Sequence, residues 1–110
     1  MTIDRCPVET TLEIIGGKWK PLIIFYLTTQ PRRFGELRRL IPRITQQMLT
    51  LQLRELEADG IVNREVFAEV PPRVVYSLTD DGRSLEPVLE SMLAWGLRRA
   101  QQPVAPVVMS

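Results

Sequence analysis

The sequence has no histidine and only one cysteine, Cys6, in its 110 residues. The usual zinc-finger ligand sets, the Ser-His-Asp triad and the Cys-His pair therefore cannot be built within one chain. No GxxxxGK(S/T) or GxGxxG loop occurs, since Gly16-Gly17-Lys18 lacks the preceding strand and the spacing that would cradle a phosphate. These absences argue against most simple hydrolases and nucleotide enzymes. We expect no catalytic activity, no metal and no cofactor.

Long apolar runs are also missing. No run approaches the roughly 18 residues that span a bilayer, and the N-terminus MTIDRCPVE lacks a basic-then-apolar signal pattern. One cysteine cannot form an intramolecular disulfide, which favours a reducing compartment. With 45% apolar and 25% charged residues, the composition is that of a globular protein. We expect a cytoplasmic protein without membrane contact, with one domain over residues 1–100 and an irregular tail over residues 101–110.

The net charge of +1 hides an uneven distribution along the chain. Residues 1–54 contain nine Lys or Arg and four Asp or Glu, whereas residues 55–110 contain five and nine. The first part therefore carries +5 and the second part −4. Several arginines of the first part have only Glu36 among them, which creates a local positive field. They are Arg32, Arg33, Arg38, Arg39, Arg43 and Arg54.

Apolar residues at helical spacing predict four helices in the first 60 residues, followed by a hairpin and a long C-terminal helix. Pro7 suits the first helical position, Thr45 is the expected N-cap of the fourth helix and Gly60 its C-terminal stop. The segment Thr79-Asp80-Asp81-Gly82 offers an N-cap before the last helix. The helices are expected at residues 8–15, 18–28, 34–41, 45–59 and about 84–99, and the strands at residues 61–70 and 74–78.

Short helices, with a pair joined by a tight turn, and then a hairpin predict a mainly α protein with a winged helix-turn-helix fold. In that fold the second helix of the pair lies in the major groove and the first crosses the DNA backbone. Its polar side chains suit this role, because amide groups pair with adenine and a guanidinium pairs with guanine or phosphate. The residues expected at base edges or phosphates are Thr45, Gln46, Gln47, Thr50 and Arg54.

The chain resembles the HxlR-type winged-helix transcriptional regulators of bacteria over roughly residues 6–96. The resemblance rests on the segments CPVE, IGGKWK, RRFGELRR, LRELEADGIV, EVPPRVVYSLT and GRSL, in this order and at close spacing. It implies a homodimer that binds a pseudo-palindromic operator in double-stranded DNA. It also implies that residues 45–59 lie in the major groove, that the hairpin near residues 69–74 is the wing, and that the first and last helices form the dimer interface.

Other basic residues are expected to position the protein on DNA through phosphate contacts. Arg73 follows two prolines that stiffen the hairpin loop, and it could reach phosphates or the minor groove. Lys18 lies at a helix start, where a cation opposes the helix dipole, so a solvated surface role stays open for it and for Lys20. The phosphate-contact residues are expected to be Lys18, Arg32, Arg33, Arg38, Arg39 and Arg73.

The predicted dimer interface consists of apolar residues that one 110-residue subunit cannot readily cover. They recur at spacings of three and four on the first and last helices. The expected interface residues are Val8, Leu12, Leu85, Val88, Leu89, Met92 and Trp95.

Cys6 allows two interpretations. A lone cysteine is usually an inert small hydrophobe, but the N-terminal end of a helix and the neighbouring Arg5 both favour a reactive thiol. The resemblance adds that some family members sense oxidants or electrophiles through a cysteine at this position, whereas many others only retain it. A redox or small-molecule effector is therefore possible, and its identity stays open.

Two alternatives to a DNA-binding regulator stay open at this stage. Leu51 lies on the expected DNA face, where an apolar residue suits a winged-helix module that binds a protein partner. A small enzyme would need an active site shared between subunits, and no acid–base pair, metal set or phosphate loop supports it.

Overall fold

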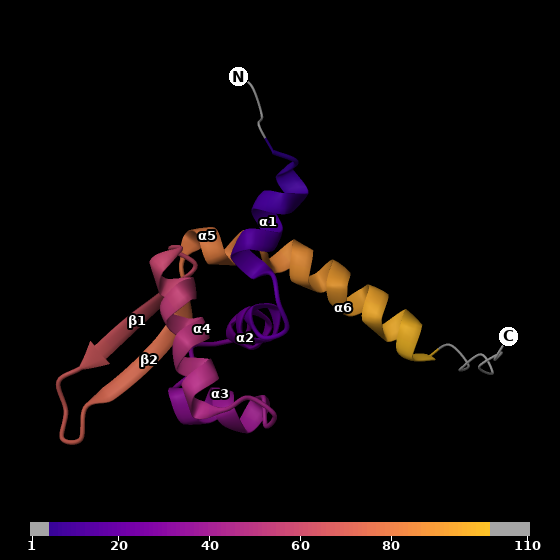
Figure 1. Cartoon of the computed structure of the whole chain (residues 1–110). Coiled ribbons are helices and arrows are strands. Elements are labelled where there is room, and N and C mark those ends of the chain that lie inside the picture. The colour runs from indigo at the N-terminus through magenta and orange to yellow at the C-terminus, as the bar shows by residue number, and fades with distance from the viewer. Residues whose placement is uncertain (1–4, 102–110) are drawn as a thin grey trace, which may run out of the picture.

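The computed structural model describes residues 5–101 as a helical body with a two-stranded hairpin on one side (Figure 1). The predicted mainly α winged helix-turn-helix fold is confirmed, with element boundaries that shift by a few residues. The elements are α1 (Pro7–Ile15), α2 (Lys20–Leu27), α3 (Phe34–Leu40), α4 (Gln46–Ala58), β1 (Val62–Phe67), β2 (Arg73–Leu78), α5 (Asp80–Arg83) and α6 (Glu86–Gln101).

Local signals set most helix ends as predicted. Pro7 opens α1, and the hydroxyl of Thr45 accepts a hydrogen bond from the Met48 amide at 3.1 Å at the start of α4. Gly60 follows α4 with a φ of 72°, a left-handed conformation that favours glycine. Gly17 also has a positive φ, of 86°, and α2 begins at Lys20 instead of residue 18.

The core is assembled around α2, which lies in the middle of the fold in Figure 1 and contacts α3, α4, β2 and α6. Every element except α5 contributes a buried aliphatic side chain, so the hairpin and the last helix share one core with the helix pair. Trp19 packs against this core, half-buried. The main buried residues are Ile15, Ile23, Ile24, Leu27, Leu37, Leu49, Leu53, Leu56, Val62, Leu78 and Leu89.

The hairpin is antiparallel, with Val62 opposite Leu78 at its base and Phe67 opposite Arg73 near its loop. It is joined to the helical body by a bridge in which the amides of Arg32 and Tyr76 each donate to the other's carbonyl oxygen, at 2.9 and 2.8 Å. This bridge fixes the hairpin beside the segment that leads into α3.

The predicted long C-terminal helix is α6, and a short helix that was not predicted, α5, precedes it. Thr79 caps α5 as expected, since its hydroxyl accepts from the Gly82 amide at 2.9 Å. The helix cannot continue directly into α6, because Pro87 has no amide to donate to the carbonyl of Arg83. Helix α6 ends at Gln101, inside the predicted irregular tail, and the remainder of that tail lies outside the described residues.

Candidate nucleic-acid interface

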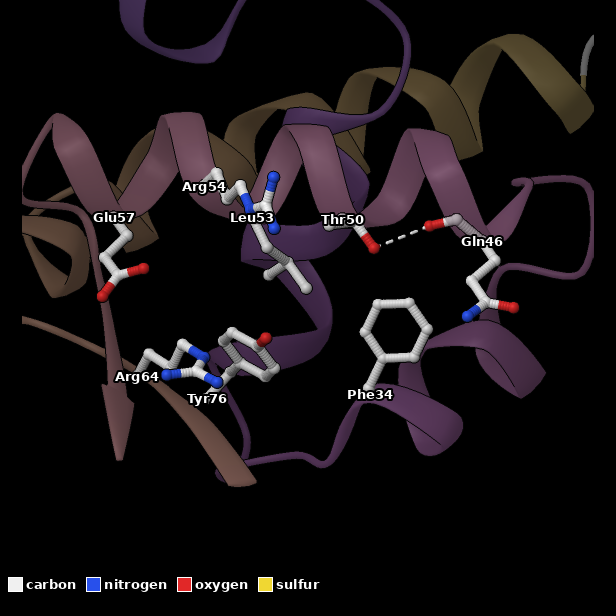
Figure 2. A pocket seen from close by; sticks show the side chains of 8 residues that line it. All are labelled: Phe34, Gln46, Thr50, Leu53, Arg54, Glu57, Arg64 and Tyr76. Carbon is white, nitrogen blue, oxygen red and sulfur yellow. Dashed lines mark hydrogen bonds between the residues drawn. The ribbon is translucent and has the colours of Figure 1, made fainter. Parts of the chain in front are cut away.

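The exposed face of α4 carries the polar residues predicted to read DNA. Leu49, Leu53 and Leu56 fix the opposite face of α4 in the core. Gln46, Gln47, Leu51 and Arg54 are exposed, and Thr50 is half-buried with its hydroxyl donating to the Gln46 carbonyl at 2.9 Å (Figure 2). A helix held on one side and free on the other can enter a groove without rearranging the core.

The arginines on and before α3 differ in their surroundings. Arg33, Arg38 and Arg39 are exposed, and within residues 5–101 their guanidinium groups have no ion-pair partner. Glu36, whose carboxylate accepts the backbone amide of Arg33 at 3.0 Å, supplies only one negative charge against these three guanidinium groups. This surface therefore retains a positive charge suited to phosphate.

Arg32 was predicted to contact phosphate, but its side chain is turned toward the end of α2. Its Nε donates to the Tyr26 carbonyl at 2.9 Å and its Nη2 to the Thr29 hydroxyl at 3.0 Å. A cation at this position satisfies carbonyl groups at the negative end of the helix. Arg32 therefore has a structural role that sequence periodicity does not reveal.

The two lysines before and in α2 also have intramolecular partners. The Lys18 ammonium lies 4.6 Å from the centroid of the Trp19 ring, and the Lys20 ammonium lies 3.3 Å from Glu55 Oε2. Lys20 therefore links α2 to α4 through its ion pair, whereas the ammonium group of Lys18 is exposed at the surface.

Arg73 begins β2 and is held by the hairpin itself. Its guanidinium carbon lies 4.2 Å from the centroid of the Phe67 ring, and its Nη2 lies 3.2 Å from Glu69 Oε1. The Nε atom is buried without a hydrogen-bond partner among the described residues. Contact between Arg73 and DNA stays a prediction and would require at least the Glu69 ion pair to open.

A groove of about 540 Å³ separates α4 from the hairpin. Figure 2 shows Arg54 and Glu57 on its α4 wall, Arg64 and Tyr76 on its hairpin wall, and Phe34 of α3 beside them. Arg64 and Tyr76 were not singled out from the sequence. The available signal was the alternation of strand side chains, which places Arg64 on the same face as buried Val62.

Comparison with known proteins identifies the family. The HxlR-like helix-turn-helix family model matches residues 14–103. This chain belongs to that family. An HTH-type transcriptional regulator of Bacillus subtilis (strain 168), YdeP, is 62% identical over 93 residues, which cover 84% of this chain and 73% of YdeP.

Solved structures of HxlR-like and related regulators share the fold. The redox regulator HypR in its oxidised form matches with a TM-score of 0.83 and 56% identity, over 90% of this chain and 100% of HypR. The reduced transcriptional regulator YodB from B. subtilis matches with a TM-score of 0.75 and 40% identity, over 88% of this chain and 96% of YodB. YodB also matches in diamide-treated and quinone-bound forms. The chain is thus an HxlR-type HTH transcriptional regulator, and the relatives named above are transcriptional regulators.

Cys6 of this HxlR-like chain is exposed and occupies the N-cap position of α1 with extended backbone. Arg5 favours the Cys6 thiolate less than predicted, because its guanidinium forms a bidentate ion pair with Glu13, about two helix turns further on. Hydrogen bonding to Glu13 raises the pKa of Arg5, and the same contact lowers the pKa of the Glu13 carboxyl. The helix N-terminus remains as the feature that favours a reactive thiol.

Helices α1 and α6 extend away from the body in Figure 1 and present apolar side chains. Trp95 is 61% exposed, and a hollow of about 230 Å³ between α2 and α6 is lined by Leu22, Met92 and other apolar residues. Leu89, predicted at the dimer interface, is only 4% exposed and belongs to the chain's own core. Leu85 is half-buried against that core. The exposed members of the predicted interface are Val8, Leu12, Val88, Met92 and Trp95.

Within residues 5–101, no helix is long and apolar enough to cross a membrane, and no group of His, Cys, Asp and Glu could hold a metal ion.

Proposed function

We propose that this HxlR-type regulator is a homodimer that binds a pseudo-palindromic operator in double-stranded DNA, with residues 1–100 as the DNA-binding unit and no catalytic activity. The observation that carries the proposal is the exposed face of α4. Gln46 and Gln47 offer hydrogen-bond donors and acceptors for base edges, and Arg54 offers donors for bases or phosphates, on a helix whose other face is fixed in the core. On and before α3, the other helix of the pair, Arg33, Arg38 and Arg39 are exposed and have no ion-pair partner within residues 5–101, which suits phosphate contact.

Dimer formation is supported by the apolar surface on α1 and α6. Val8 and Leu12 on α1, and Val88, Met92 and Trp95 on α6, are exposed aliphatic or aromatic residues on elements that extend from the body. A second copy of the chain would cover them and present two α4 helices to two half-sites.

A redox input through Cys6 is the finer part of the proposal. It is supported by the exposure of the thiol and by the likeness to HypR, which is a redox regulator. The chain has no second cysteine, so an oxidant would give a disulfide between subunits or a mixed disulfide with a small thiol, and an electrophile would give an adduct by addition of the thiolate.

Selection of bound sequences from random duplexes, followed by binding measurements from about 50 to about 200 mM salt, tests the proposal. We expect an inverted repeat whose half-sites lie about 34–36 Å apart or a multiple of this, and an affinity that falls steeply with salt. Leu51, 49% exposed on the same face, favours the competing function of binding a protein. That function predicts no enriched sequence and little dependence on salt.

A further inference from the structure

The hairpin turns one charged side chain toward α4. Side chains alternate along a strand, so Val62, Arg64 and Val66 share one face with their cross-strand partners Leu78, Tyr76 and Val74. Val62 and Leu78 are buried in the core at the base of the hairpin. Arg64 and Tyr76 form the next pair outward, where this face leaves the core and becomes a wall of the groove beside α4.

The groove contains two guanidinium groups and one carboxylate. Arg54 lies on the α4 wall and Arg64 on the hairpin wall, while Glu57 is the acidic residue that lines it (Figure 2). Within residues 5–101, neither arginine has an ion pair within 4 Å or a side-chain hydrogen bond. The groove therefore has a net positive charge and unoccupied N–H donors, and the Tyr76 hydroxyl points into it.

The groove is continuous with the exposed face of α4. Gln46, Thr50 and Arg54 line both the groove and the shallow hollow over that face. An α-helix with its side chains is about as wide as the major groove, so a duplex that holds α4 places its phosphate strands along the sides of this helix. One of these strands would follow the side of α4 that faces Arg64.

Resting on the proposed function, we propose that Arg64 and Arg54 hold one phosphodiester strand of the DNA between the hairpin and α4. Each guanidinium donates hydrogen bonds to phosphate oxygens from its own wall of the groove. Glu57 opposes the same phosphates by like-charge repulsion and limits the affinity of the groove for any duplex. These contacts position the protein, and base reading remains with the exposed face of α4.

Replacement of Arg64 by glutamine tests the phosphate contact. We expect Arg64→Gln to weaken binding about tenfold both to the selected operator and to a random duplex of equal length. The slope of log K against log salt should fall by about 1, and the ratio of the two affinities should stay unchanged. Arg64→Lys should keep most of the salt slope, because it keeps the charge.

Arg83→Gln is the matched control for charge. Arg83 is exposed on α5 and is not among the residues that line the groove. It should bind both duplexes like the wild type. Equal thermal unfolding midpoints would show that the variants are folded. Wild-type affinity and salt slope in folded Arg64→Gln would overturn this inference alone, whereas wild-type protein that binds no duplex would overturn the proposed function as well.

Replacement of Glu57 tests whether its carboxylate repels the bound phosphates. Glu57→Gln should raise the affinity for both duplexes several-fold, and the gain should be smaller in the Arg64→Gln background, where Arg54 alone holds the same phosphates near position 57. Glu65→Gln removes a carboxylate from the opposite face of the hairpin and should give a smaller gain. If Glu57→Gln raised the DNA affinity equally in the wild-type and Arg64→Gln backgrounds, the two side chains would not act on the same phosphates.

Discussion

Lys20 of α2 and Glu55 of α4 form an ion pair, with Nζ 3.3 Å from Oε2. The Lys20 side chain is only 13% exposed, whereas that of Glu55 is 40% exposed. The pair joins the central helix to the helix that carries the candidate DNA face. It also makes the two partners unequal, because the ammonium is the more strongly desolvated of the two charges.

This inequality predicts an order of stability for the two single variants. Glu55→Gln should lower the free energy of unfolding by about 1 to 3 kcal/mol, because it leaves a mostly buried ammonium without its partner. Lys20→Met should cost less than about 1 kcal/mol, since the apolar side chain fills the same space and Glu55 can be hydrated. Urea unfolding of both variants measures the difference, and the reverse order would contradict it.

Substitutions of base-reading residues on α4 should change sequence preference, whereas substitutions of phosphate-contact arginines on and before α3 should not. Gln47→Ala should cost about 1 to 3 kcal/mol at the selected operator and relax the preference at one base position. Arg33→Ala is the control, and it should weaken all sequences evenly. Binding to a set of single-base operator variants separates the two. Even losses from Gln47→Ala would place specificity in operator shape instead.

The dimer prediction depends on the apolar side of α6. Trp95→Asp should shift the protein from dimer to monomer at micromolar concentration, because a carboxylate would have to be buried between subunits. Sedimentation measures this shift. Ala94→Asp adds the same charge at an exposed position between Glu90 and Arg98 and should leave the dimer intact. A wild-type monomer would remove the basis for paired half-sites.

The redox prediction concerns Cys6. Diamide or a quinone should release the wild-type protein from its operator, whereas Cys6→Ser should bind normally and be insensitive to either reagent. Adducts at the start of α1 would lie near the proposed dimer interface and could tilt the two α4 helices relative to each other. Anisotropy of labelled operator before and after treatment measures release. If wild type and Cys6→Ser lost operator binding equally after treatment, Cys6 would have only a packing role.

The ion pair between Arg5 and Glu13 predicts a pH dependence at α1. Hydrogen bonding to Arg5 lowers the pKa of Glu13 from its ordinary value of 4.5. The contact therefore stabilises α1 above that value and is lost as the pH falls through the lowered pKa. We expect faster amide exchange in the first turns of α1 below this pH. Glu13→Gln should show the faster exchange at neutral pH as well, after correction for intrinsic rates.

Local sequence determined the helix ends and the face that each helix buries. Thr45 and Gly60 bound α4 through a hydroxyl cap and a left-handed backbone, which depend on neighbouring residues alone. The spacing of Leu49, Leu53 and Leu56 fixed the buried face of α4, and its exposed face followed. These features and the ordered family segments were sufficient to predict the fold and the candidate DNA helix.

Tertiary structure decided which charged side chains are placed to contact DNA. Arg32 and Arg33 are adjacent and chemically identical, yet the bridge to Tyr76 turns Arg32 toward the end of α2 while Arg33 stays exposed. Arg64 appears in an ordinary strand, and only packing of the hairpin beside α4 places it opposite Arg54. A side chain's partners come from segments distant in sequence, so periodicity can assign it to a face but cannot say what lies across from it.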